Sequence, residues 1–280
     1  MNLGLAVLST FATVTGLCVG SFLNVCIHRI PMDLSLIRPA SRCPSCGHPI
    51  RLRDNIPVLS WLLLRGRCRD CGTPISSIYP AIELLTGIVS LLIFRRVIPT
   101  EMDLDYPHLG LWVLYFGLAA ALIADAFIDL RYQIIPFELS VYLVPLFVGG
   151  WALLDHYGMG GVGFKGAVLG ALFGGGAFAF LGLLWRGLFR KTAVGGGDIY
   201  LTMMIGSGIG AWPALPYVLV LASLIGSAFG IALVFVRRAF FGVSFPFGPP
   251  LALATITYLI HGPLGAERYF ADLQWLFAPR

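Results

Sequence analysis

The chain has 280 residues, of which 58% are hydrophobic and only 12% are charged, and its mean hydropathy is +0.85. Soluble domains carry about 25% charged residues, so this composition excludes an ordinary soluble protein and indicates an integral membrane protein. The net charge of +5 resides in loops beside lipid-length apolar runs. That pattern is typical of membrane topology and anionic headgroups rather than of nucleic-acid binding.

Apolar runs near the length of a membrane-spanning helix follow one another along the chain. Such runs match the hydrocarbon thickness when helical, and in lipid their backbone groups must be satisfied within the helix. The sequence therefore predicts an all-α polytopic membrane protein, a bundle of about eight transmembrane helices. The runs are residues 3–27, 79–94, 109–128, 135–154, 166–188, 199–212, 217–236 and 249–260.

The first run lacks a basic amino-terminal region and is followed by Arg29, so we expect it to be retained rather than cleaved as a signal peptide. Lysine and arginine accumulate in cytoplasmic loops. If the amino terminus lies outside, 14 of the 19 basic residues fall in inner loops. This asymmetry predicts that both termini lie outside and that the segment between the first two runs is cytosolic.

That segment, residues 28–78, carries two Cys-x-x-Cys pairs, Cys43 with Cys46 and Cys68 with Cys71. The spacing is typical of a zinc ribbon with four sulfur ligands. Disulfides are disfavoured in the cytosol, so we expect structural Zn²⁺, with free thiols or a redox pair as the alternative. The predicted domains are a first transmembrane helix (1–27), a cytosolic zinc-binding loop with four cysteine ligands (28–78) and a transmembrane core (79–280).

Several carboxylates interrupt the apolar runs, where they are costly and therefore functional candidates. Asp125 and Asp129 lie four residues apart on one helical face, and Asp198 opens the sixth run. The topology places Asp129 and Asp198 at one cytoplasmic depth. Two such carboxyl groups can share a proton, deprotonate water and protonate a carbonyl oxygen or leaving amine, which is aspartic peptidase chemistry. Gly195 and Gly197 are expected to let a substrate backbone approach.

Other classes of protein fit parts of this pattern. A proton-coupled transporter also carries intramembrane acids, but it predicts an inverted repeat that we do not find. A presenilin-like intramembrane protease shares Gly-x-Gly-Asp and calls for a later Pro-Ala-Leu; here those letters occur at residues 213–215, only fifteen residues after Asp198. A non-catalytic assembly factor built on the zinc loop would leave Asp129 and Asp198 dispensable.

Several segments together resemble the type 4 prepilin peptidase family. They are GSFLNVCIHRIP (20–31), CPSC and CRDC, DNIPVLSWLLLRGRC (54–68), YPAIELLTG (79–87), DLRYQIIP (129–136), GGGD (195–198) and FPFGPPLALA (245–254). The resemblance implies a bacterial inner-membrane aspartic endopeptidase that removes the basic leader of type IV prepilins and type II secretion pseudopilins after a glycine, at the cytoplasmic face. Its catalytic aspartates map onto Asp129 and Asp198.

The same resemblance implies that relatives with the cysteine-rich loop also methylate the new amino terminus from S-adenosylmethionine. Glu83 and the GSFLNV segment are candidates for that site, and the alternative is that Glu83 pairs with an arginine of the loop. Asp125 falls outside the family motif and is expected to have a supporting or merely interfacial role, although its position one turn before Asp129 keeps it as a rival. The family often has Asp or Asn where this chain has Phe137, and Lys where it has Tyr200. The particular pilin and the oligomeric state stay open.

Overall fold

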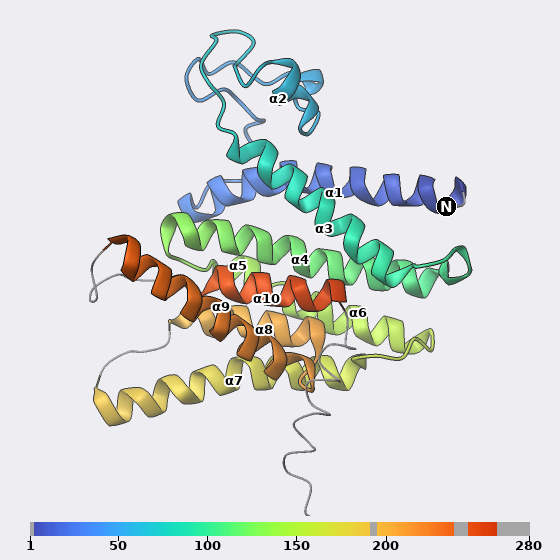
Figure 1. The fold of residues 1–280 in the computed structure, drawn as a ribbon, viewed down its shortest axis with the longest axis vertical. Helices are drawn as coiled ribbons and strands as arrows, with labels where there is room; N and C mark the ends of the chain where they lie inside the picture. The colour runs from blue at the N-terminus through green and yellow to red at the C-terminus, as the bar shows by residue number, and fades with distance from the viewer. Residues whose placement is uncertain (1–2, 191–194, 238–245, 262–280) are drawn as a thin grey trace, which may run out of the picture. The chain divides into compact units, whose positions relative to one another are not determined.

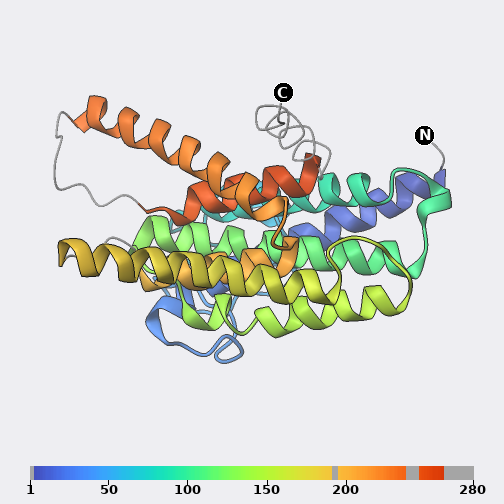
Figure 2. The same cartoon turned by 90° about the horizontal axis from the view of Figure 1, so that it is seen from below.

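The structure is a computed structural model that describes residues 3–190, 195–237 and 246–261. Helices account for its regular structure, and the described residues contain no β-sheet (Figures 1 and 2). The α-helices are α1 (Leu3–Arg29), α2 (Leu59–Leu63), α3 (Ile78–Val97), α4 (Tyr106–Tyr132), α5 (Phe137–Ser140), α6 (Val144–His156), α7 (Gly163–Phe189), α8 (Gly196–Ile209), α9 (Ala214–Arg237) and α10 (Gly248–His261). Short 3-10 helices cover Ile30–Met32, Leu52–Asp54 and Glu101–Asp103. The predicted all-α class is confirmed.

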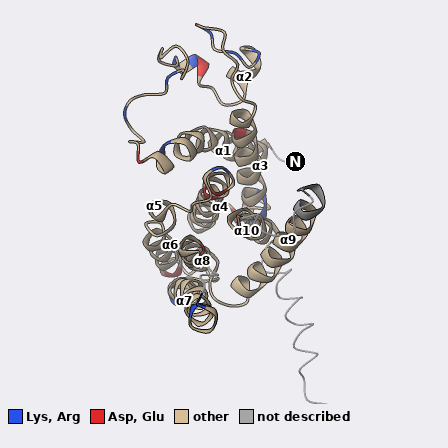
Figure 3. Cartoon of the chain, turned by 90° about the vertical axis from the view of Figure 1, so that its left-hand side faces the viewer, with Lys and Arg blue, Asp and Glu red and all other residues tan. Residues whose placement is uncertain are grey.

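Six helical stretches within the described residues are long and apolar enough to cross a membrane, which corrects the predicted count of eight. They are Leu3–Met32, Ile78–Val97, Tyr106–Tyr132, Phe137–His156, Gly163–Phe189 and Ala214–Ala232. The predicted sixth and eighth runs form α8 and α10, which have 14 residues each. At about 1.5 Å per residue these helices are roughly 21 Å long, short of a hydrocarbon core of about 30 Å. In Figure 3 most of each helix is tan, the colour of residues other than Lys, Arg, Asp and Glu.

The chain divides into two compact units, Met1–Asp103 and Leu104–Arg280. In the first unit α1 packs along α3, and glycines allow the backbones to meet. A Cβ added to Gly16 would lie 2.8 Å from the Gly87 Cα, and one added to Gly20 would lie 2.7 Å from the Glu83 Cα. The cysteine-rich segment leads from α1 through α2 to α3 (Figure 1). The predicted three-domain division stays a prediction.

The second unit contains α4 to α10, and α4 forms its centre, with eight consecutive buried residues from Leu118 to Asp125. Helix α10 packs on α4, and α7 packs along α8. Gly170 of α7 and Gly206 of α8 lie backbone to backbone, where a Cβ on either would overlap the other's carbonyl. Thr202 adds a hydrogen bond to the Gly174 carbonyl at 3.0 Å. The small-residue spacing of this span therefore serves helix packing.

Candidate active site

Asp129 and Asp198 come from different helices of the second unit. Asp129 lies in the last turn of α4, and Asp198 lies in the first turn of α8. Helix α4 packs against both α8 and α10. Asp129 is buried, with 5% of its surface exposed, and Asp198 is partly exposed. The two acids that the sequence singles out therefore lie in the terminal turns of two helices that contact each other.

A third element, α10, completes the surroundings of Asp129. The Gly248 backbone N–H donates to Asp129 Oδ2 at 2.9 Å. Gly248 is the first residue of α10, so the carboxylate caps that helix and faces its positive end. A Cβ on Gly248 would lie 2.7 Å from Asp129 Oδ2, so only glycine allows this approach. Sequence reasoning quoted the FPFGPP segment but missed Gly248 itself.

The glycines before Asp198 shape the start of α8. Gly195 caps the helix, and its carbonyl accepts a hydrogen bond from the Asp198 N–H at 3.2 Å. A Cβ on Gly195 would lie 3.2 Å from Asp198 Oδ2, so the carboxyl group lies directly beside this cap. A Cβ on Gly197 would lie 2.8 Å from the Ile135 Cβ, whereas Gly196 has open space beside it. The space beside Gly197 is therefore filled by the chain's own Ile135.

Asp125 lies one turn before Asp129 but has a different environment. It is fully buried, and Ser140 Oγ donates to its Oδ2 at 3.4 Å. Its Oδ1 has no hydrogen-bond partner among the described residues. Because no part of Asp125 reaches the surface, it is poorly placed to contact a substrate.

Phe137 and Tyr200, the two residues that differ from the family pattern, contact each other. Phe137 of α5 and Tyr200 of α8 lie with ring centroids 5.1 Å apart at an interplanar angle of 89°. Tyr142 also packs edge-to-face against Phe137, with its ring centroid at 5.6 Å. Edge-to-face pairs of this kind stabilise a contact beyond the area they bury. The pair joins α5 to α8 two residues beyond Asp198, and sequence reasoning did not foresee it.

The four predicted zinc ligands gather in the first unit. The Sγ atoms of Cys43, Cys46, Cys68 and Cys71 all lie within 4.8 Å of one another, and all four cysteines are free of disulfides. Cys43 Sγ and Cys71 Sγ are 3.8 Å apart. Tetrahedral zinc with Zn–S bonds of about 2.3 Å separates its sulfurs by about 3.8 Å. The donor set and its spacing therefore fit Zn²⁺.

The two cysteine pairs have the same pattern of backbone hydrogen bonds. In the first, Cys43 N–H donates to the His48 carbonyl and Gly47 N–H to the Cys43 carbonyl; in the second, Cys68 N–H donates to Thr73 and Gly72 N–H to Cys68. Gly47 and Gly72 both have a positive φ, of 71° and 70°. Each turn thus places two sulfurs on one side. Hydrogen bonding to Thr73 lowers the pKa of Cys71 to about 6, which favours the thiolate that binds metal.

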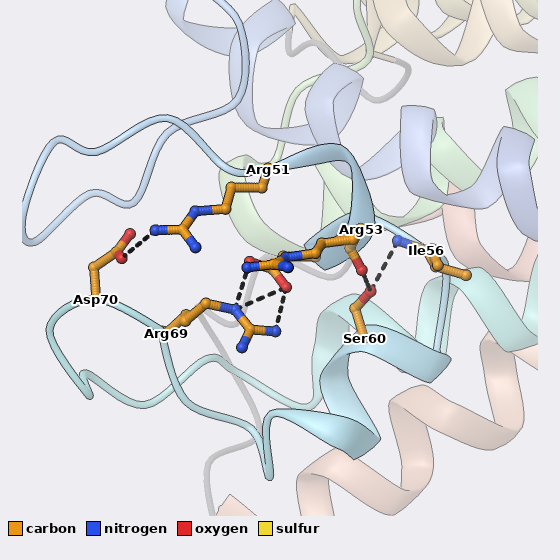
Figure 4. A network of polar contacts seen from close by, with 7 residues as sticks. Arg51, Arg53, Ile56, Ser60, Arg69 and Asp70 are labelled. Atoms are coloured by element: carbon orange, nitrogen blue, oxygen red, sulfur yellow. Dashed lines mark hydrogen bonds and ion pairs between the residues drawn. The ribbon is translucent and has the colours of Figure 1, made fainter.

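Glu83 lies elsewhere in the first unit, near the start of α3. It is buried, with 8% of its surface exposed. Its Oε2 accepts a hydrogen bond from the Val58 N–H at 2.7 Å, and it forms no ion pair with any described residue. Pairing with a loop arginine is therefore wrong for the described part of the chain. Arg69 pairs instead with Asp54 and Arg51 with Asp70 (Figure 4).

Residues 14–97 match the family described as Bacterial Peptidase A24 N-terminal domain, and residues 112–231 match the Type IV leader peptidase family. No solved structure matches the chain.

Curated relatives carry consistent names. A prepilin leader peptidase/N-methyltransferase of Myxococcus xanthus is 43% identical over 223 residues, covering 80% of this chain and 62% of the relative. One of the same name from Aeromonas hydrophila is 38% identical and covers 88% of each chain. A type 4 prepilin-like proteins leader peptide-processing enzyme of Escherichia coli is 38% identical, covering 90% of this chain and 93% of that one.

Proposed function

Because the chain belongs to the type IV leader peptidase family, a family of peptidases, we propose that it cleaves the leader of prepilin-like substrates with Asp129 and Asp198 as its catalytic pair. The observation that carries this proposal is the position of Asp129 in the last turn of α4 and of Asp198 in the first turn of α8, two helices that contact each other. The multi-pass character of the chain agrees with a substrate that is itself a membrane helix.

The chemistry follows from the pair. One carboxylate takes a proton from a water molecule, and the resulting hydroxide attacks the scissile carbonyl carbon while the protonated partner donates to the carbonyl oxygen. Collapse of the tetrahedral intermediate breaks the C–N bond, and the leaving amine takes a proton from the first acid. Asp198 is partly exposed and Asp129 is held against α10, so substrate would approach from the side of Asp198.

The proposal also assigns the location and the substrate. By the distribution of basic residues, the cysteine-rich segment and the ends of α4 and α8 that carry the aspartates face the cytoplasm of a bacterial inner membrane. The substrates are type IV prepilins and type II secretion pseudopilins, cut after glycine where their hydrophobic helix begins. Structural Zn²⁺ on the four cysteines would hold the loop folded, since four thiolate ligands leave no open position for a reactant.

A second activity, methylation of the new amino terminus, is proposed from the names of the relatives. The required methyl donor is S-adenosylmethionine, whose methyl group is activated by the positive sulfonium. Among the predicted residues, Glu83 is the carboxylate of the first unit that is suited to orient a cationic group.

The test is leader cleavage by purified protein in detergent, with a prepilin-like peptide and detection by mass spectrometry. We expect Asp129→Asn and Asp198→Asn to lower the rate by about 10⁴-fold or more, because each removes a group that exchanges a proton in the reaction. Asp125→Asn is the matched control on the same helix face and should retain most of the rate. Thermal unfolding establishes that the variants are folded. Substantial cleavage by folded Asp198→Asn protein would contradict the catalytic pair.

A further inference from the structure

Helix α2 of the cysteine-rich segment exposes three leucines on one side. Leu59, Leu62 and Leu63 are 56%, 57% and 80% exposed. Their spacing of three and four residues places them on one helical face, which we call the leucine face. Large apolar side chains gathered in this way are unfavourable in water. With five residues α2 is too short to cross a membrane, so the six candidate spans among the described residues do not account for this face.

The other side of α2 is fixed to the rest of its segment. Ser60 is buried, and its Oγ donates to the Arg53 carbonyl at 3.1 Å and accepts from the Ile56 N–H at 2.9 Å (Figure 4). Trp61 Nε1 donates to the Ile75 carbonyl at 3.0 Å. These hydrogen bonds set the rotation of α2 about its axis, so the leucine face cannot turn inward without breaking them.

Helix α2 is held beside the start of α3 (Figure 1). The N–H of Val58, the residue before α2, donates to Glu83 Oε2 at 2.7 Å. Glu83 is five residues beyond Ile78, the first residue of α3, which is about 7.5 Å along the helix axis. The 20 residues of α3 extend about 30 Å, the thickness of the hydrocarbon core, so its first turns lie at the membrane surface. The contact therefore holds α2 at the depth where interfacial amphipathic segments bury their apolar face, about 5–10 Å into the boundary between headgroups and acyl chains.

The segment that carries α2 is strongly basic. Residues 28–78 contain eight arginines and three aspartates, a net charge of +5 that equals the net charge of the whole chain. Zinc held by four thiolates would remove about two of these charges and leave the segment basic. Arg65 and Arg67 come just after α2, are exposed, and form no ion pair with a described residue. Each basic residue of this kind strengthens attachment to an anionic lipid surface by roughly fivefold.

We propose that the leucine face of α2 docks on the anionic lipid surface of the membrane, with Leu62 and Leu63 in the headgroup boundary and Arg65 and Arg67 on lipid phosphates. An apolar face, attachment at the start of a membrane helix and neighbouring positive charge are together the properties of an interfacial amphipathic segment. The occupant is lipid rather than a peptide with a basic leader, because the positive segment repels such a peptide. Docking gives the cysteine-rich segment a further attachment, beyond its chain connections to α1 and α3.

The test is amide hydrogen exchange of the whole protein in lipid nanodiscs, followed by mass spectrometry. One set of discs contains phosphatidylcholine alone and the other an equal mixture with phosphatidylglycerol, and each disc holds a single copy of the protein. In the mixed discs we expect residues 59–65 to exchange about tenfold more slowly, because docking stabilises the backbone hydrogen bonds of α2 against opening. High salt should abolish the difference, since it screens the arginines.

Two double variants separate the contribution of the leucines from that of the arginines. Leu62→Gln with Leu63→Gln should speed the exchange of α2 in both kinds of disc, and Arg65→Gln with Arg67→Gln should remove the difference between the discs. Met102→Gln is the matched control and should exchange as wild type, since Met102 is 96% exposed in the same unit but lies beyond the other end of α3. Exchange in α3, measured on the same samples, establishes that the unit is folded.

The outcomes distinguish lipid from a protein partner. Exchange of residues 59–65 that is equal in both kinds of disc at low salt, or that the leucine variant leaves at the wild-type rate, would overturn the proposal. Protection that requires a second copy in the disc, or an added prepilin-like peptide, would also overturn it and would identify a protein partner for the leucine face.

Discussion

Replacing Gly248 by alanine tests whether the contact between α10 and Asp129 matters for catalysis. The added Cβ would lie 2.7 Å from Asp129 Oδ2 and 3.3 Å from its Cβ and Cγ. An ordinary carbon–oxygen contact is about 3.3 Å, so the oxygen must move by roughly 0.6 Å. The hydrogen bond from Gly248, now 2.9 Å, would stretch to about 3.5 Å and be lost.

The size of the effect follows from the bond that is removed. A hydrogen bond to a charged group contributes about 1.5–3 kcal/mol. If that bond holds Asp129 in its reactive position, the loss lowers the rate of leader cleavage by about 10- to 150-fold. The displacement acts on a group that takes part in the reaction, so we expect the loss in kcat rather than in KM.

The assay is steady-state cleavage of a prepilin-like peptide by detergent-purified protein, with thermal unfolding measured on the same samples. Gly117→Ala is the control, since Gly117 lies on α4, the helix that carries Asp129, and nothing lies within 4 Å of its added Cβ. A folded Gly248→Ala protein that cleaves at the wild-type rate would refute the reasoning.

Three further experiments test the helix packing, the aromatic pair and the metal site. Gly206→Ala should lower the thermal unfolding midpoint, since overpacking costs about 1–3 kcal/mol, while Gly176→Ala, with open space beside it, should not. A double-mutant cycle of Phe137→Leu and Tyr200→Leu should give a coupling energy of about 0.5–1.5 kcal/mol in unfolding, and strictly additive effects would show that the ring contact contributes nothing. Cys43→Ser should reduce bound zinc, measured by elemental analysis, from one equivalent to none, and unchanged metal content would exclude the four-cysteine site.

Features with a local signature could be predicted from the sequence. The apolar runs and the paired cysteines each lie within a short segment and depend on helix period or turn geometry. The prediction that Asp129 and Asp198 lie at one depth required one more step, a membrane topology inferred from the arginines alone. The structure places these acids in the terminal turns of α4 and α8, two helices that contact each other.

Features that depend on contacts between distant segments escaped prediction. Asp129 and Gly248 are 119 residues apart, and no periodicity links them. The same is true of Phe137 and Tyr200. In the sequence they are two unrelated replacements of polar residues, and only the structure shows that their rings contact each other. The prediction that α8 and α10 span the membrane was wrong. Hydropathy shows that a run is apolar, but a helix must also be long enough to cross the bilayer.

A helix amino terminus faces each of the two proposed catalytic acids. Asp198 lies in the first turn of α8, and Asp129 accepts the first N–H of α10. Neither forms an ion pair with a described residue. A lysine or arginine would neutralise the charge but would also occupy the carboxylate oxygens that must bind water and substrate. Backbone N–H groups and helix dipoles stabilise negative charge without that competition. This arrangement explains how an apolar chain retains two carboxylates without basic partners, and why glycine stands at both helix starts.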